Sequence, residues 1–456
     1  MTRRKAANEY GVSRIVSRIA IGVLAGVIVL GGVGVTASAN GWLPLGPLGS
    51  LNPEAYVGDP PSQGAPVAGL SSADAGIVAD AASIQQRLAA LDLNGVGVVS
   101  YSVTDLAGTT VAAHEEGTAA IPASAMKILT SLGALSAYGA DHRFATTVVD
   151  SPDGIILVGG GDPALRDGDP LIAGQATLAT LADATATALT ASGRTSVALG
   201  FNDSLFSGPM WHPNWPAEYG ADVAPISALS ASPQGWSEAD TAADAAAAFA
   251  RLLGERGITV TAVTGRVTPA ADTASVASIL SPTLGEIVQH VVTTSYNFGA
   301  EVLLRHVSLA AGGDGSFSGG AAALSTFLQT HGLWSGAMTI ADGSGLAREN
   351  KVPPAILAAA VRTAYKEVGY HDVLNGLPVA GVTGTLSRRF DDPIEAPGRG
   401  VVRAKTGTLD DVHTITGFVQ ANSGAIMVFS FMVNQTTVWD ASLNWLDGAA
   451  TVLATS

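Results

Sequence analysis

Strand-like segments at both ends of this chain constrain its fold more than any other feature. Near the C-terminus, three short segments rich in Val, Ile, Thr and Phe are separated by the turn sequences GTLD and ANSG; they are residues 401–405, 412–420 and 425–433. Towards the N-terminus, residues 96–104 and 109–113 are joined by DLAG, which is typical of a hairpin. We therefore expect the early hairpin and the late three-strand meander to share one antiparallel sheet.

The segments around and between these strands complete the predicted architecture. Residues 74–91 and 438–453 have the apolar spacing of amphipathic helices, and we expect both to pack on the sheet. Residues 146–281 differ in character, because they mix further strand-like stretches with Ala-rich helices. The sequence thus predicts an α+β protein whose main domain (74–145 and 282–456) contains the antiparallel sheet, flanking helices and a helical subdomain, with an α/β domain inserted in it.

The first 73 residues have the composition of an export segment and a linker. Basic residues precede an uncharged apolar run at 19–35, and small residues follow at 37–39. This order is typical of a secretory signal peptide, although the length also suits an uncleaved membrane anchor. Residues 1–39 are therefore interpreted as a signal or anchor and residues 40–73, rich in Pro and Gly, as a linker. Both alternatives predict an extracytoplasmic protein, either secreted or anchored to the cell membrane.

Charge and composition exclude several classes of function. The formal net charge is −15, and lysines are few, so the chain is a poor candidate for binding nucleic acid. The absence of cysteine excludes disulfides, thiol catalysis and Cys-ligated metals. The histidines are scattered, and HEEG at His114 does not continue to the zinc motif H-E-x-x-H. We therefore expect neither a metal site nor a cofactor.

One of the rare lysines follows a serine at helical spacing in IPASAMKILT (121–130). Residues three apart lie on one face of a helix, so Ser124 and Lys127 can touch. A serine hydroxyl needs a base to become a nucleophile, and a lysine whose pKa is lowered by burial can be that base. The alternative, which this motif alone leaves open, is an N-capping serine beside a solvated lysine.

A second short motif, AKTGTL (404–409), stands at the end of a predicted strand. In that position Lys405 and Thr406 would face a cleft and bind a carboxylate. Gly407 has no side chain, so a peptide can lie close to the strand and pair with it. The alternative is a simple turn at the end of the strand.

A third motif, SYN (295–297), lies between two predicted helices at 284–293 and 300–307. The hydroxyl of Ser295 would relay a proton between Lys127 and a leaving group, and Asn297 would hold a substrate amide. Taken singly, the motif also fits a polar turn between helices. The order S-x-x-K, S-x-N, K-T-G, however, is the signature set of the penicillin-binding proteins and serine β-lactamases.

Longer stretches extend this resemblance over the chain from about residue 74 onward. The chain resembles the low-molecular-mass class C penicillin-binding proteins, the D-alanyl-D-alanine carboxypeptidase/endopeptidase family S13. The resemblance rests on PASAMKILTSLGAL (122–135), LVGGGDPAL (157–165), TSYNFGAEVLLR (294–305), DGSGLARENKV (342–352) and AKTGTLDDV (404–412). It implies the penicillin-binding-protein/serine β-lactamase-like transpeptidase fold.

The resemblance also implies a role for each residue of the three motifs. Ser124 would be the nucleophile, Lys127 its base and Ser295 the proton relay. The substrate would be held by Asn297, Lys405, Thr406, Gly407 and Thr408, with the terminal carboxylate on Lys405 and Thr406, and an oxyanion hole formed by the main-chain N–H groups of Ser124 and Thr408.

Three further points come from the comparison with the family pattern. Residues 342–346 resemble a structural motif of the family. Tyr296 stands where an acidic or small polar residue is frequent, which would reshape the pocket. The inserted domain is expected to be shorter than in the larger members, so its role in substrate choice is open.

The expected function is that of an exported serine DD-peptidase, a D-Ala-D-Ala carboxypeptidase or endopeptidase. Its partners would be peptidoglycan stem peptides ending in D-Ala-D-Ala, β-lactams that acylate Ser124, and the membrane if the N-terminal segment is uncleaved. One alternative is a serine β-lactamase, although the long gap before Ser295 differs from the usual class A layout. The other is a non-catalytic cell-wall-binding protein with the same fold.

Overall fold

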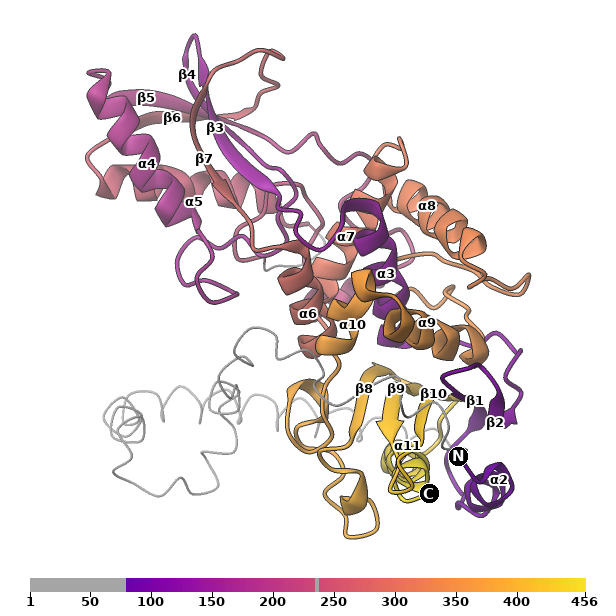
Figure 1. Cartoon of the computed structure of the whole chain (residues 1–456). Coiled ribbons are helices and arrows are strands. Elements are labelled where there is room, and N and C mark those ends of the chain that lie inside the picture. The colour runs from indigo at the N-terminus through magenta and orange to yellow at the C-terminus, as the bar shows by residue number, and fades with distance from the viewer. Residues whose placement is uncertain (1–78, 234–237) are drawn as a thin grey trace, which may run out of the picture. The chain divides into compact units, whose positions relative to one another are not determined.

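The computed structural model describes residues 79–233 and 238–456 (Figure 1). The predicted signal or anchor (1–39) and the linker (40–73) lie outside the described residues. Within the described ranges, no helix combines the length and the apolar character needed to cross a bilayer.

The first sheet joins strands from both ends of the sequence, as predicted. Its order is β2-β1-β10-β9-β8, and every neighbouring pair is antiparallel. The strands are β1 (Val98–Asp105), β2 (Thr110–His114), β8 (Val402–Leu409), β9 (Val412–Gln420) and β10 (Ile426–Asn434). Strand β8 therefore forms one edge of this sheet. Val379 bridges its outer side at Arg403, and beyond Ala404 no described strand pairs with that side.

Helices cover both faces of this sheet, and the central strand β10 has apolar side chains on both faces. Phe429 and Phe431 belong to the core shared with α2 (Ala81–Ala89) and α11 (Trp439–Ala454), as the sequence predicted. Val428 points to the opposite face, where α9 (Pro354–Lys366) packs. The alternation follows from the two-residue period of a strand, and a strand buried on both faces reads as a continuous apolar run.

The face of the sheet on the α9 side is covered by a helical subdomain (Figure 1). Besides α9, its helices are α3 (Met126–Tyr138), α6 (Leu284–Thr294), α7 (Asn297–Ala310), α8 (Phe317–Thr330) and α10 (His371–Asn375). Helix α3 contacts α6, α7, α8 and α9, so it lies at the centre of the subdomain. The short 3-10 turns of the described residues are η4 (Ala123–Ala125), η5 (Ala217–Ala221), η6 (Val368–Tyr370), η7 (Gly384–Leu386) and η8 (Ala396–Gly398).

A second sheet lies in the region predicted to be inserted. Its order is β6-β5-β4-β3-β7; the first three strands are parallel, and β3 is antiparallel to both of its neighbours. Helices α4 (Leu178–Ala191) and α5 (Thr241–Glu255) pack on it. The strands are β3 (Ala145–Ser151), β4 (Gly154–Val158), β5 (Ser196–Asn202), β6 (Thr259–Arg266) and β7 (Ser275–Leu280). The boundaries of an inserted domain at 146 and 281 stay a prediction.

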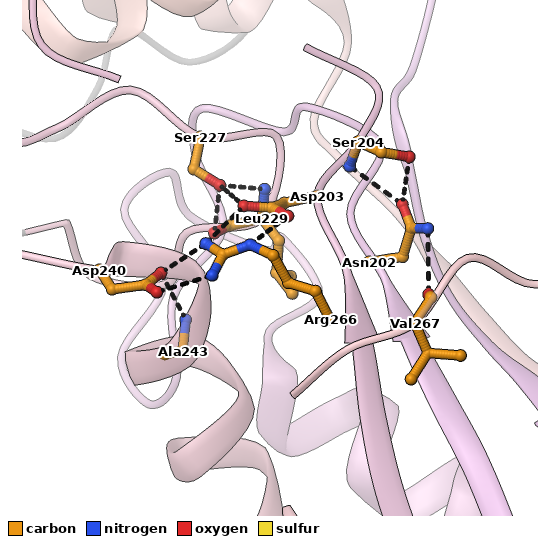
Figure 2. Close-up of polar contacts among 9 residues, drawn as sticks. All are labelled: Asn202, Asp203, Ser204, Ser227, Leu229, Asp240, Ala243, Arg266 and Val267. Carbon is orange, nitrogen blue, oxygen red and sulfur yellow. Dashed lines mark hydrogen bonds and ion pairs between the residues drawn. The ribbon is translucent and has the colours of Figure 1, made fainter. Parts of the chain in front are cut away.

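An ion-pair cluster fastens one edge of the second sheet (Figure 2). Arg266, at the end of β6, donates through Nε to Asp203 Oδ1 (2.9 Å) and through Nη2 to Asp240 Oδ1 (2.8 Å). Asp240 is also the N-cap of α5 and accepts from the Ala243 N–H (3.1 Å). One guanidinium thus connects β6, the segment after β5 and the start of α5.

The position of the K-T-G motif in its strand differs from the sequence prediction. We expected the strand to end at Lys405, whereas β8 continues to Leu409, so the motif lies in the middle of the strand. The reason is pairing with β9, in which Gly407 is opposite Thr414 and Thr408 is opposite His413. Cross-strand pairing outweighs the low strand propensity of glycine, which a local sequence pattern cannot show.

Candidate active site

Ser124 lies in the 3-10 turn η4, directly before α3, and is half-buried. The sequence predicted it at a helix start, and the structure places it two residues before the first α-helical residue, Met126. Ala123 adopts a φ of 46°, which is uncommon for a residue with a side chain. The backbone is therefore bent immediately before the serine, as is frequent at functional sites.

Lys127 is brought into direct contact with Ser124. Its Nζ lies 2.8 Å from Ser124 Oγ, 2.7 Å from Asn297 Oδ1 and 2.8 Å from the main-chain oxygen of Ser344. A neutral amine has two N–H donors and one lone pair, so these three contacts also suit a lysine that donates to Asn297 and Ser344 and accepts the Ser124 proton. The alternative of a solvated lysine is wrong, since the side chain is 0% exposed.

Burial lowers the pKa of Lys127 into the range expected of a catalytic base. Removal from water lowers its pKa from 10.5 to about 7, and the negative charges of Glu301 and Asp342 oppose this shift. A base is most effective when its pKa lies near the working pH. Lys127 therefore has both the contact and the pKa to take the proton of Ser124.

The S-x-N motif spans the junction of α6 and α7. Ser295 is the residue after α6, with a left-handed φ of 61°, and it is half-buried at the cleft. Asn297 begins α7; it accepts from Lys127 and donates through Nδ2 to the main-chain oxygen of Asp222 (3.1 Å). Both ends of the Asn297 amide are thus engaged, and its predicted contact with a substrate amide stays a prediction.

The side chains of β8 divide between its two faces. Thr406 and Thr408 line the cleft, and Thr406 Oγ1 donates to Thr385 Oγ1 (2.7 Å). Lys405 is not among the residues that line the cleft: it is 0% exposed, and its Nζ donates to the main-chain oxygen of Thr406 (2.7 Å). Successive residues of a strand point to opposite faces, and the expectation that Lys405 and Thr406 bind a substrate carboxylate together stays a prediction.

Burial and the charge of Lys127 lower the pKa of Lys405 well below its usual value. Direct binding of a carboxylate by Lys405 stays a prediction.

Gly407 has a structural reason to be glycine. A Cβ at this position would lie 2.2 Å from Thr414 Oγ1 and 2.8 Å from the main-chain oxygen of Pro122. Thr414 Oγ1 also donates to that oxygen (3.0 Å), so the sheet and the turn that carries Ser124 touch here. Gly407 therefore permits the close approach of β8 to the turn that carries Ser124. Pairing of a substrate peptide with this strand stays a prediction.

A cleft of about 350 Å³ collects most of the predicted residues. It is lined by Ser124, Ser295, Asn297, Thr406 and Thr408. Four further lining residues escaped the sequence prediction: Thr385, Arg389, Trp439 and Leu443. They come from the segment before β8 and from the start of α11, far from the motifs, so no local pattern marked them.

Residues of the second sheet region also reach the site. Tyr296 Oη donates to the main-chain oxygen of Pro163 (3.2 Å), and Trp215 Nε1 donates to Asp342 Oδ2 (2.9 Å). With the Asn297–Asp222 contact, these bonds connect the helices behind the cleft to the segments around β4 and β5. The unusual Tyr296 of the S-x-N motif is thus an anchor for the loop that contains Pro163.

The chain is similar to known carboxypeptidases along most of its length. It matches the D-Ala-D-Ala carboxypeptidase 3 (S13) family over residues 79–235 and 230–454. It is 30% identical to a carboxypeptidase of Mycobacterium tuberculosis over 387 residues, which cover 80% of this chain and 82% of the relative.

Solved structures share the fold. Penicillin-binding protein 4 of Haemophilus influenzae aligns with a TM-score of 0.69 at 21% identity, over 83% of this chain and 100% of that one. The same protein complexed with a β-lactam aligns with a TM-score of 0.62 at 21% identity, over 81% of this chain and 98% of that one. The predicted α+β fold of the penicillin-binding-protein type is therefore confirmed.

Proposed function

Because the chain belongs to the D-Ala-D-Ala carboxypeptidase 3 (S13) family and is a serine-type D-Ala-D-Ala carboxypeptidase, we propose that it works through an acyl-enzyme on Ser124. The observation that carries this proposal is the buried Lys127, whose Nζ lies 2.8 Å from Ser124 Oγ. The substrates would be peptidoglycan stem peptides that end in D-Ala-D-Ala.

In the first step, neutral Lys127 takes the proton of Ser124 while the serine oxygen attacks the carbonyl carbon of the penultimate D-Ala. The main-chain N–H groups of Ser124 and Thr408 would stabilise the resulting oxyanion. Ser295, at the edge of the same cleft, would pass the proton to the nitrogen of the leaving D-Ala. The peptide bond breaks, and an ester to Ser124 remains.

In the second step, a water molecule attacks the ester and loses its proton to the same base, which releases the shortened peptide and regenerates Ser124. The terminal carboxylate of the substrate would meet the hydroxyl groups of Thr406 and Thr408, which face the cleft. Thr385 holds Thr406 through its 2.7 Å contact and so orients this end of the site. A β-lactam, which resembles the substrate, would acylate Ser124 in the same way.

Two finer points belong to the proposal. Cleavage of cross-linked peptides, which is endopeptidase activity, would require the edge of β8 to accept a second strand of substrate. Export is supported by the composition of residues 1–39, and the protein would act outside the cytoplasm, either secreted or anchored.

The deciding experiment is covalent labelling of the protein with a reporter penicillin, followed by peptide mapping, beside a Ser124→Ala control. A stable adduct on Ser124 that is absent from the control supports the proposal. Release of D-Ala from a D-Ala-D-Ala peptide, and cleavage of a cross-linked dimer, then separate carboxypeptidase from endopeptidase activity. Rapid hydrolysis of the reporter would favour a β-lactamase, and neither adduct nor turnover would favour a wall-binding protein.

A further inference from the structure

The loop 342–346, which the sequence marked only as a structural motif, touches the base. The main-chain oxygen of Ser344 is one of three acceptors around Lys127 Nζ, at 2.8 Å. On α3, one turn after Lys127, Thr130 Oγ1 donates to the main-chain oxygen of Gly343 (2.7 Å). Two consecutive carbonyl groups of the loop are therefore bound from the α3 side.

The same piece of backbone is held from the other side by a carboxylate. Glu301, on α7, accepts from the Gly343 N–H through both oxygens (3.1 and 3.0 Å) and from the Ser344 N–H (2.6 Å). Glu301 lies one turn after Asn297 on α7, so a single helix face provides both Asn297, which binds Lys127 directly, and Glu301, which binds the loop.

Burying the carboxyl group of Glu301 costs free energy, so this side chain needs polar partners. Glu301, Ser344 and Lys127 are all 0% exposed. A buried carboxylate is tolerated when it accepts hydrogen bonds or faces a cation. Burial and the charge of Asp342 raise the pKa of Glu301 to about 8, whereas the hydrogen bonds from Gly343 and Ser344 lower it. The loop therefore provides the hydrogen bonds that a buried carboxyl group needs.

We propose that Glu301 is a positioning residue for the base: its carboxyl oxygens fix the Gly343–Ser344 peptide, and the carbonyl of Ser344 in turn fixes the Nζ of Lys127 beside Ser124. The proposal rests on the proposed function, since it assigns to Lys127 the role of base. It gives the loop 342–346 a catalytic purpose, because a lysine with three fixed partners keeps its lone pair directed at the serine.

The charged groups around Lys127 set the direction of the expected pH effect. Glu301 on α7 and Asp342 on the loop raise the pKa of Lys127, whereas burial lowers it. Lys405 on β8 is a second lysine close to it, and its pKa is also lowered by burial. Loss of the negative charge of Glu301 should therefore lower the pKa of Lys127 and move the acidic limb of the rate profile to lower pH.

The test is the rate of acylation by a reporter penicillin between pH 5 and 9 for the full chain and for Glu301→Gln. We expect the plateau rate to fall by about tenfold or more, because the Ser344 carbonyl loses its support. We also expect the acidic limb to move to lower pH. Glu255→Gln, which removes an exposed carboxylate from α5, is the matched control and should change neither quantity.

Two outcomes overturn the proposal while leaving the proposed function intact. One is an acidic limb in Glu301→Gln at the wild-type position, because a merely structural residue lowers the rate without moving the limb. The other is a plateau rate in Thr130→Val equal to that of the wild type. This variant removes the hydrogen bond from α3 to the same peptide, and it decides the question if Glu301→Gln does not fold. Failure of the wild-type protein to be acylated would instead contradict the proposed function itself.

Discussion

The charged clusters of the two sheet regions are built from similar residues but differ in burial. At the first sheet, Arg389 pairs with Asp447 of α11 through two hydrogen bonds (2.7 and 2.6 Å), with side chains 16% and 4% exposed. At the second sheet, Arg266 pairs with Asp203 and Asp240, yet the arginine side chain is 45% exposed. Protein groups therefore surround the Arg389–Asp447 ion pair, whereas water hydrates much of the Arg266 guanidinium.

This difference determines what the loss of one partner should cost. A charge left alone in water is rehydrated, whereas a charge left alone in the interior has no substitute for its partner. Burial also shifts protonation, so the ionisable groups of the catalytic region can perform chemistry at neutral pH. The pKa of Lys127 at about 7 is the clearest example.

The largest effect is expected at the buried base. Lys127→Met removes the only group in contact with Ser124 Oγ among the described hydrogen bonds, so acylation by a reporter penicillin should slow by about 10³-fold or more. Stopped-flow fluorescence measures the rate. The matched control is Lys366→Met, at the exposed end of α9, which should react like the wild type. A Lys127 variant that acylates normally would show that another group acts as the base.

The pH dependence of the wild-type protein follows from the same burial. Only neutral Lys127 can accept the serine proton, and its pKa is lowered to about 7. The acylation rate should therefore rise with pH, reach half of its maximum near the pKa, and fall by about tenfold for each pH unit below it. A rate measured between pH 5 and 9 that stays constant would contradict a lysine base.

The next largest effect should appear in stability at the buried ion pair. Arg389→Gln leaves Asp447 without its cation at a site where burial already raises the pKa of this carboxyl. We expect a loss of about 3–5 kcal/mol in the free energy of unfolding, measured by urea denaturation. A loss below about 1 kcal/mol would mean that water replaces the arginine.

A smaller effect is expected where the two regions meet. Tyr296→Phe removes one hydroxyl that donates to the Pro163 oxygen and leaves the partly buried ring in place. The free energy of unfolding should fall by about 1 kcal/mol. Hydrogen exchange of the loop around Pro163 should increase in this variant, and unchanged exchange would show that the hydroxyl does not hold the loop.

The smallest effect should come from the exposed cluster in Figure 2. Arg266→Gln breaks more ion pairs than Arg389→Gln, yet it should cost at most about 1 kcal/mol, because the side chain is 45% exposed. The same urea titration compares the two variants directly. Equal losses for both would refute the argument that burial, and not the number of ion pairs, decides the cost.

The parts of the site that the sequence predicted well are those with local geometry. Ser124 and Lys127 are three residues apart, and the helical turn that joins them brings their side chains together whatever surrounds them. The antiparallel sheet was also predictable, because apolar runs and turn sequences mark β9 and β10.

The errors occurred where a contact with a distant segment decides the local structure. The end of β8 was placed too early, since its pairing with β9 carries the strand through Gly407. Glu301 was within a quoted family stretch, and its helical spacing from Asn297 could have drawn attention to it. Its partner, the peptide of Gly343 and Ser344, was not recognisable, because nothing in the chain's order relates α7 to that loop.

By itself, the sequence determined the order of strands and helices, the contact between Ser124 and Lys127, and the division into two kinds of sheet, because these depend on side-chain period and on neighbours a few residues apart. Only the tertiary structure decided which charges are buried, which face of β8 meets the cleft, and how Glu301 is connected to Lys127 through Ser344. Burial depends on every segment that packs around a residue, so the pKa of Lys127 is a property of the fold as a whole.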